Sequence, residues 1–351
     1  MVSNIKILIT THKPFKIPKE EHFVPIHAGR EIAFETAKDG SIDQKDFDWL
    51  MQNTIGDNSG DNISTKNRLY SECTALYWAW KNYDKIGNPE YIGLMHYRRH
   101  FIFNEEYFQN KEKNKLEKAL SYISEEFISE NYLNNIGLNS ENINKICNNY
   151  DLVVTEDSDL SIINNARNIK EDYAMTIAGT KVEDFELMVK ILNQQHPEFT
   201  SLINQKIIGH QKSLYQMFIM KKELFFEYCE FLFNILFELE KQTDFTNYSI
   251  NGKRSLGYLA EELLAVFVWM KEIDPNIKIK KLGCTLIEYP YADQTLNEIL
   301  KKGCPKLVEY LFFKLKSFFL NGVEKQINKE RYQGIRNQRK AYKKLQRLLS
   351  A

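Results

Sequence analysis

The stretch Tyr91–Phe101, YIGLMHYRRHF, changes abruptly from apolar to basic side chains. Its first five residues are apolar apart from one glycine, which is typical of a buried strand. The residues from His96 to His100 then bring four basic side chains around Tyr97. A strand that leaves the core directly into such a cluster indicates that a functional edge of a sheet follows it.

A second strand ends in a similar way. The β-branched run IKILI is followed by Thr10, Thr11, His12 and Lys13. In open α/β sheets ligands bind at the carboxyl ends of the strands. Parallel pairing of the two strands would therefore gather Lys13, two arginines and two histidines (His12 and His96) at one edge. Such a cluster repels itself unless a polyanion binds there, and a diphosphate suits the planar donors of arginine. The alternative is that Arg98 and Arg99 pair with carboxylates of the chain itself.

Composition and patterning predict an α/β fold. The chain has 351 residues, 43% of them hydrophobic and 27% charged, as in globular proteins. Strand patterns lie mainly in the first half, whereas helical patterns dominate the second half, at 182–194, 197–207, 222–241 and 255–271. We expect a mostly parallel sheet flanked by helices within 1–295, with a nucleotide-binding part at about 1–155 and a helix-rich part at about 156–295.

The last segment, 296–351, predicts a basic amphipathic helical tail. Residues 301–351 contain 14 Lys and Arg against three Glu, although the whole chain has no net charge. Aromatic residues accompany these charges in VEYLFFKLKSFFLNGV, a combination that suits an anionic membrane surface. A solvated tail and a dimer contact are the alternatives. Nucleic-acid binding is not expected, because the rest of the chain is acidic and contains no known nucleic-acid-binding motif.

The segment 64–83 predicts one helix with two opposite faces. Leu69, Cys73, Leu76 and Trp80 form its core stripe. A second stripe on the opposite side carries neutral polar groups and an indole, and we expect it to line a ligand cleft, with contact between the helix and a polar loop as the alternative. Its members are Asn67, Ser71, Thr74 and Trp78.

A further candidate lies in KRSLGYLAEELLAVF, 253–267. Glu261 falls off the core stripe of this helix, beside Gly257 and on the side of Tyr258 and Arg254, with Glu262 expected to face solvent. A carboxylate in that setting could take a proton from an attacking hydroxyl group as a general base. A structural Arg–Glu pair is the alternative.

Several other kinds of site are excluded. The chain has no G-x-x-x-x-G-K-[ST], no G-x-G-x-x-G after a strand, no serine-hydrolase elbow and no H-E-x-x-H. Five scattered cysteines form no C-x-x-C pair, which argues against a disulfide framework or a zinc site and favours a reducing cytoplasm. The loop from Asp57 lacks the glycine and the glutamate of a calcium loop.

Four ordered segments resemble a bacterial family of capsular-polysaccharide glycosyltransferases formerly classed as a domain of unknown function. They are DNISTKNRLYSECTALYWAWKN, YIGLMHYRRHF, LYQMFIMKKELFFEYCEFLFNILFELE and RSLGYLAEELL, and the resemblance covers roughly residues 5 to 290. It implies a GT-A-like fold and a nucleotide-sugar donor, and some members are associated with galactofuranose transfer. Thr11, His12 and Lys13 would then hold the nucleotide.

The chain departs from the wider GT-A pattern at one point. GT-A enzymes usually carry an Asp-x-Asp pair that binds a divalent metal, and here His96-Tyr97-Arg98 stands in its place. We therefore expect no required cofactor, with Arg98 and Arg99 stabilising the leaving diphosphate directly and Mg or Mn as the alternative. His96 competes with Glu261 for the role of base.

These observations together predict a cytoplasmic hexosyltransferase. We expect it to move a hexose, such as galactofuranose or galactose, from a UDP-sugar to a growing capsular or surface polysaccharide, with a lipid-linked acceptor at the inner face of the membrane. Asn67, Ser71, Thr74, Tyr97, Arg99 and Arg254 would bind the donor. A sugar-phosphate transferase and a non-catalytic glycan- or nucleotide-binding scaffold are the competing functions.

Overall fold

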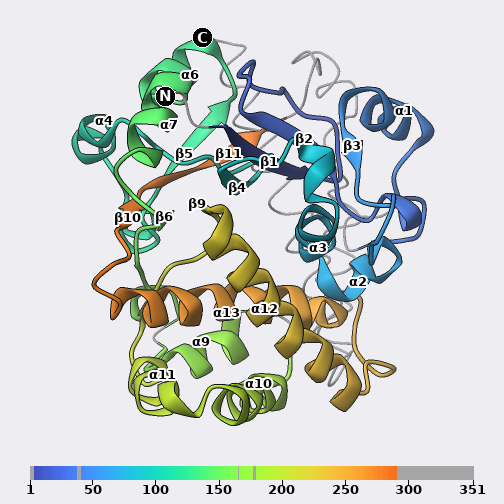
Figure 1. Cartoon of the computed structure of the whole chain (residues 1–351), viewed down its shortest axis with the longest axis vertical. Coiled ribbons are helices and arrows are strands. Elements are labelled where there is room, and N and C mark those ends of the chain that lie inside the picture. Colours follow the sequence, from blue (N-terminus) through green and yellow to red (C-terminus); the bar gives the residue numbers. More distant parts are fainter. Residues whose placement is uncertain (1–3, 38–40, 165, 177–178, 291–351) are drawn as a thin grey trace, which may run out of the picture.

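The computed structural model describes residues 4–37, 41–164, 166–176 and 179–290, so the expected basic tail lies outside the described residues. A central sheet has helices on both of its faces (Figure 1). The strands are β1 (Ile5–Thr11), β2 (Phe23–His27), β3 (Ile55–Gly56), β4 (Tyr91–His96), β5 (Tyr122–Phe127), β6 (Leu152–Thr155), β7 (Ser158–Asp159), β8 (Gln211–Lys212), β9 (Phe218–Lys221), β10 (Ile279–Leu282) and β11 (Cys284–Tyr289).

Seven strands form the central sheet in the order β10-β6-β9-β4-β1-β2-β3. All neighbours are parallel except β9, which runs antiparallel between β4 and β6. The expected mostly parallel α/β architecture is therefore confirmed. The sheet takes strands from both halves of the chain, because β9 and β10 come from the helix-rich half.

The helices surround this sheet on both sides. They are α1 (Gln44–Asn53), α2 (Asn67–Tyr70), α3 (Cys73–Lys81), α4 (Glu105–Asn110), α5 (Lys115–Ala119), α6 (Glu130–Ile136), α7 (Ser140–Cys147), α8 (Ser161–Asn164), α9 (Ile169–Thr176), α10 (Val182–Gln195), α11 (Thr200–Ile207), α12 (Lys222–Gln242) and α13 (Ser255–Glu272). The four helical segments expected in the second half are all present. The stretch 104–149 contains, besides α4, α5, α6 and α7, strand β5, which pairs with β11 and not with the main sheet.

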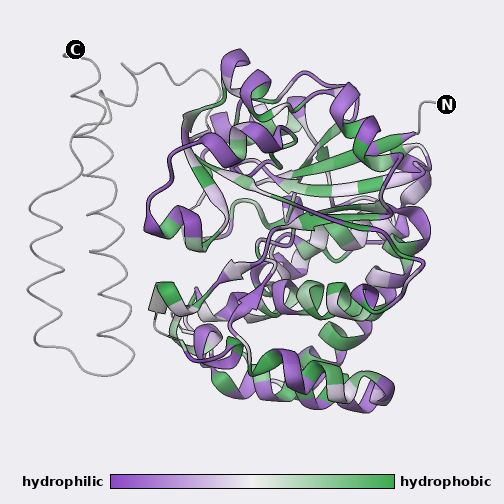
Figure 2. Ribbon diagram, turned by 90° about the vertical axis from the view of Figure 1, so that its left-hand side faces the viewer, coloured by the Kyte–Doolittle hydropathy of each residue, from purple (hydrophilic) through white to green (hydrophobic). Residues whose placement is uncertain are grey.

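Alternating residues of the strands pack into two separate hydrophobic cores, one on each face of the sheet. Leu8, Ile92 and Leu94 face helices α3, α12 and α13, whereas Ile7 and Ile9 face the opposite side, where α6 and α7 lie. This period-2 alternation with apolar residues on both faces is what a sheet covered on both sides requires. In Figure 2 the central strands are mostly green, while purple is concentrated on loops and outer helices.

The register of the sheet brings the ends of three strands together. Thr10 of β1 lies beside His96 of β4, and Thr11 lies beside His27 of β2. Because all three strands are parallel, their carboxyl ends open at the same edge. Within the described part of the chain, none of the helices has the length and apolar character needed to cross a membrane.

Candidate functional site

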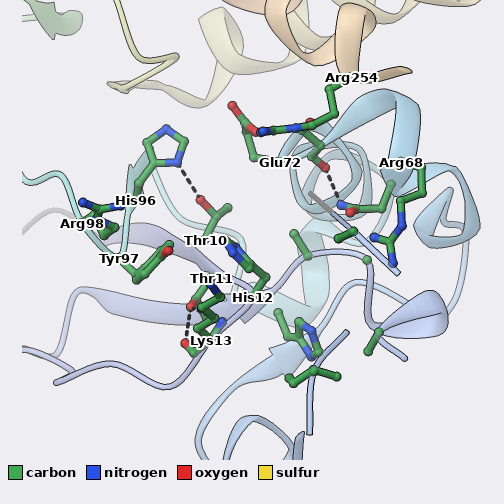
Figure 3. Close-up of a pocket in the computed structure, with 18 of the residues that line it drawn as sticks. Thr10, Thr11, His12, Lys13, Arg68, Glu72, His96, Tyr97, Arg98 and Arg254 are labelled. Atoms are coloured by element: carbon green, nitrogen blue, oxygen red, sulfur yellow. Dashed lines mark hydrogen bonds between the residues drawn. The ribbon is translucent and has the colours of Figure 1, made fainter. Parts of the chain in front are cut away.

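A cavity of about 590 Å³ opens at the carboxyl ends of β1, β2 and β4 (Figure 3). Helices α2 and α13, and the two residues between α2 and α3, contribute side chains from the other side. Eleven of the thirteen side chains that the sequence pointed to line this cavity. They are Thr11, His12, Lys13, Asn67, Ser71, His96, Tyr97, Arg98, Arg99, Arg254 and Glu261.

The basic cluster after β4 is a tight turn. The backbone N–H of Arg99 donates to the carbonyl oxygen of His96 at 3.0 Å, and the N–H of His96 donates back to Arg99 at 3.3 Å. Tyr97 and Arg98 therefore occupy the corner of the turn, and the ring of His12 meets the Tyr97 ring edge-on at 5.4 Å. The turn places its side chains at the carboxyl edge of the sheet, beside the cavity.

His96 has both ring nitrogens engaged. Nε2 lies 2.6 Å from the carbonyl oxygen of Tyr215, so it carries a proton, and Nδ1 lies 3.2 Å from the hydroxyl of Thr10. Burial, followed by the charge of Arg99, lowers the pKa of His96 to about 4. His96 is thus a neutral, fixed imidazole at neutral pH, which orients neighbouring groups through both of its ring nitrogens.

Three guanidinium groups of the cavity contact groups other than carboxylates. Arg98 Nε donates to the carbonyl of Ile287 at 3.0 Å, Arg254 Nε donates to Ser71 at 3.1 Å, and Arg99 stacks over the Tyr215 ring at 4.4 Å. Among the described residues none of the three forms a salt bridge with a carboxylate. The alternative that the arginines are neutralised by the chain's own acids is therefore not what the described residues show.

Glu261 and Glu262 have opposite surroundings. Glu261 is half-buried in the cavity wall, where its Oε2 accepts the backbone N–H of Tyr215 at 3.1 Å. Glu262, expected to face solvent, is instead buried and accepts a hydrogen bond from buried Lys212. That expectation was wrong because α13 is packed on nearly all sides, so that even its second carboxylate is enclosed.

Tyr215 is the backbone link between these groups. It and Gln216 both have positive φ values, 76° and 46°, which residues with side chains rarely adopt. This left-handed turn directs the N–H of Tyr215 to Glu261 and its carbonyl to His96. The sequence contains no glycine or proline that would have indicated the turn.

The expected helix over 64–83 is broken, and half of its expected cleft face is buried. A 3-10 turn, Ser64–Lys66, precedes α2, and Ser71 (φ 51°, ψ −130°) separates α2 from α3. Thr74 is fully buried and does not line the cavity, since its hydroxyl donates to Asp57 at 2.6 Å; Trp78 is also buried. The prediction failed for these two residues because α3 packs between the sheet and α12 and has no cleft-facing side.

Asp57 is a structural anchor of the cavity wall. Its two oxygens accept hydrogen bonds from the backbone of Gly29 and Arg30 and from the hydroxyls of Ser64 and Thr74. Four donors fill a buried carboxylate, which agrees with the rejection of a calcium loop. Among the described residues no group of three or more His, Cys, Asp or Glu side chains could hold a metal ion.

Two other expectations about the site need correction. His100 is not part of the basic cluster at the edge: it is fully buried, and its Nδ1 lies 3.0 Å from the Tyr132 hydroxyl. Gly257, which the sequence places beside Glu261, leaves no open space there. A Cβ there would lie 2.7 Å from Ser71 Oγ, so the glycine allows α13 to pack closely against Ser71.

Sequence reasoning missed Glu72 and His27, which also line the cavity. Burial lowers the pKa of His27 to about 3, with Arg30 adding to the effect. Glu72 lies half-buried at the start of α3. The available signal was its spacing of three and four residues from Leu69 and Leu76. An uninterrupted helix would put this carboxylate within the core stripe, where a charged side chain is not expected.

Comparisons with known proteins agree with this architecture. The family model described as a domain of unknown function (DUF4422) matches residues 6–272. The apo structure of WbbM, a bifunctional glycosyltransferase, matches with a TM-score of 0.69 and 27% sequence identity, over 83% of this chain and 47% of that chain. The chain thus spans about half the length of WbbM, and no curated protein matches it. The resemblance to a glycosyltransferase family formerly of unknown function is confirmed. Because the family model covers most of the described residues, the chain belongs to the DUF4422 family.

Proposed function

We propose that this chain is a glycosyltransferase that moves a hexose from a UDP-sugar to a hydroxyl group of a glycan. The observation that carries the proposal is the cavity at the carboxyl edge of the sheet, with three guanidinium groups that have no acidic partner among the described residues. Cations gathered in this way favour a bound polyanion. The similarity to WbbM, a bifunctional glycosyltransferase, supports glycosyl transfer as the reaction.

The reaction needs charge stabilisation on the leaving group. The oxygen of the acceptor hydroxyl attacks the anomeric carbon, the bond from that carbon to the phosphate oxygen breaks, and negative charge develops on the departing nucleoside diphosphate. Arg99 and Arg254 supply fixed positive charges there, with Arg98 at the corner of the turn. Because Tyr215 and Ser71 already orient two of these groups, little rearrangement is required when the charge develops.

The proton of the acceptor hydroxyl goes to Glu261 in an inverting reaction. The Tyr215 N–H holds one of its oxygens, and no described residue donates to the other. His96 fits this role less well because both of its nitrogens are engaged. We assign His96 to positioning: it ties the end of β4 to the Tyr215 turn.

The residues present do not fit a divalent metal at the end of β4. The place of the usual acidic pair is taken by an imidazole without a free nitrogen and by cationic arginine side chains, which repel a metal ion. No step is therefore assigned to a metal. The positive charge that the metal supplies in other GT-A enzymes would come from the arginines.

The partners of the reaction are part of the proposal. The resemblance to capsular-polysaccharide enzymes supports a growing surface glycan as the acceptor, with galactofuranose or galactose as the transferred hexose. The tail at 296–351, outside the described residues, would bring the enzyme to the inner face of the membrane, where a lipid-linked acceptor lies. Truncation before residue 296 tests this: unchanged membrane recovery and unchanged activity on a lipid-linked acceptor would contradict it.

The central test is a screen of nucleotide sugars for protection against thermal unfolding, with and without EDTA. We expect at least one UDP-sugar to raise the melting temperature, with the same shift in EDTA. The Arg99→Ala variant should lose most of this protection, whereas Arg167→Ala, which breaks an exposed pair with Glu171, should keep it. Absence of protection by every UDP-sugar would refute the proposed donor class, and a phosphodiester in the product would replace the reaction by sugar-phosphate transfer.

A further inference from the structure

Glu72 is a carboxylate in the cavity wall for which the described residues supply no salt bridge. Its side chain is half-buried, and among the described residues it forms no salt bridge and accepts no hydrogen bond from another residue. Burial is the largest influence on it and raises the pKa of Glu72, against the opposing effect of Arg254. An ionised carboxylate can only accept hydrogen bonds, so its partners would have to be donors.

The backbone before Glu72 is strained in a way that aims it at the cavity. Ser71 has φ 51° and ψ −130°, a conformation that side-chain-bearing residues rarely adopt and that is found mostly where surrounding structure enforces it. Arg254 donates to the Ser71 hydroxyl, and Gly257 packs against it. The break therefore removes Glu72 from the core stripe of a continuous helix and turns it toward the cavity (Figure 3).

The neighbours of Glu72 show which part of a ligand it would meet. The charges that act on its carboxylate come from Arg254, Arg99 and His12, the side of the cavity assigned to the diphosphate. A carboxylate in this place repels phosphate, so it works against binding of the nucleotide alone. The groups next to a diphosphate in a nucleotide sugar are the hydroxyls of the sugar ring, which can donate hydrogen bonds.

We propose that Glu72 accepts hydrogen bonds from ring hydroxyl groups of the sugar carried by the nucleotide donor and thereby selects the transferred sugar. This inference rests on the proposed function, since it needs a nucleotide-sugar donor in the same cavity. Glu72 and Glu261 then have separate tasks. The first holds the sugar being transferred, and the second takes the proton of the acceptor.

The test compares UDP with UDP-sugars in binding to the full chain. Dissociation constants are measured by calorimetry for UDP, UDP-glucose, UDP-galactose and UDP-galactofuranose, with the wild type and with Glu72→Gln. Loss of a charge-assisted hydrogen bond should weaken binding of the preferred UDP-sugar by about 10- to 100-fold, while the affinity for UDP stays within about threefold of the wild-type value. Glu90→Gln, the same chemical change at an exposed position outside the cavity, should alter neither.

If Glu72→Gln lowers the affinities for UDP and for the UDP-sugar equally, or leaves both affinities unchanged, the inference is overturned while the proposed function stands. Failure of the wild type to bind UDP and every UDP-sugar refutes the proposed function itself. A second measurement needs no variant, should Glu72→Gln not fold. Analogues of the preferred UDP-sugar with one ring hydroxyl replaced by fluorine, which cannot donate, are titrated against the wild type. At least one should bind about tenfold more weakly or worse, and equal binding of all analogues overturns the inference.

Discussion

The buried ion pair between Lys212 and Glu262 makes a sharp test of the packing behind the site. Lys212 ends β8 and Glu262 lies in α13, and their side chains are only 3% and 5% exposed. One oxygen of Glu262 accepts from Lys212, and the other has no hydrogen-bond partner. The proposed perturbation is Lys212→Met, which keeps the length of the side chain and removes its charge.

The expected loss follows from what remains buried. With its partner gone, the Glu262 carboxylate is an uncompensated charge in the interior, and breaking such pairs reduces the free energy of unfolding by about 3 to 5 kcal/mol. For a chain of this size that loss lowers the melting temperature by about 4 to 7 °C. The double variant Lys212→Met with Glu262→Met buries no charge and should recover to within about 2 kcal/mol of the wild type.

The assay is urea unfolding of the wild type, both single variants and the double variant. Lys206→Met is the matched control, because its pair with Glu272 is 42% and 29% exposed and should contribute less than about 1 kcal/mol. A loss below about 1 kcal/mol for Lys212→Met, or a double variant no more stable than the single, would refute the reasoning.

The same variant has a defined pH dependence. Burial already raises the pKa of Glu262, and Lys212 is the main influence that lowers it. Removing Lys212 raises the pKa of Glu262 further. Glu262 of the variant is therefore protonated at a higher pH, and its protonation removes the cost of the buried charge. The deficit of Lys212→Met relative to the wild type is therefore largest well above that pKa and should shrink as the pH falls from 8 towards 5.

Three further predictions concern acid stability, nucleotide affinity and close packing. The pKa values of buried His27 and His100 are lowered to about 3, below the unfolded value of about 6.5, so the stability that each neutral ring contributes is complete above pH 6.5 and is lost as the pH falls towards 3. At pH 5.5 each histidine should have lowered the free energy of unfolding by about 1.4 kcal/mol. In urea titrations, the free energy of unfolding of a His100→Gln variant should therefore fall by about 1.4 kcal/mol less than that of the wild type between pH 7.5 and 5.5. Arg99→Ala should weaken UDP binding by about 10- to 100-fold in calorimetry, because it removes a charged donor without breaking an ion pair. Gly257→Ala should destabilise the fold by about 1 to 3 kcal/mol in thermal unfolding, since the new Cβ would lie 2.7 Å from Ser71 Oγ, and unchanged stability would contradict this packing.

The end of β4 could be predicted from sequence because two local signals coincide there. An apolar run long enough for one strand stops at His96, and a second such run stops at Thr10. Parallel pairing then brings the two ends together, as the register of Thr10 with His96 confirms. The candidate base was found similarly, because Glu261 stands off the apolar stripe of a strongly periodic helix.

What could not be predicted depends on tertiary packing that overrides local pattern. Nothing in the residues around Ser71 marks a helix break, since its contacts are with Arg254, just before α13, and with Gly257 in α13. Glu262 looks like a solvent-facing residue until Lys212, fifty residues away in sequence, is seen to reach it. Both failures are long-range, and periodicity reports only short-range order.

The Tyr215 turn explains why the site needs the buried pair behind it. One residue in the left-handed conformation sends its N–H to Glu261, its carbonyl to His96 and its ring beneath Arg99. The proposed base and the proposed diphosphate site are thus positioned by the same backbone unit. Such a conformation persists only when its surroundings enforce it, and Lys212, three residues earlier, is held to α13 by the buried pair. Loosening that anchor would therefore displace the base and the guanidinium group together, because Tyr215 is their common support.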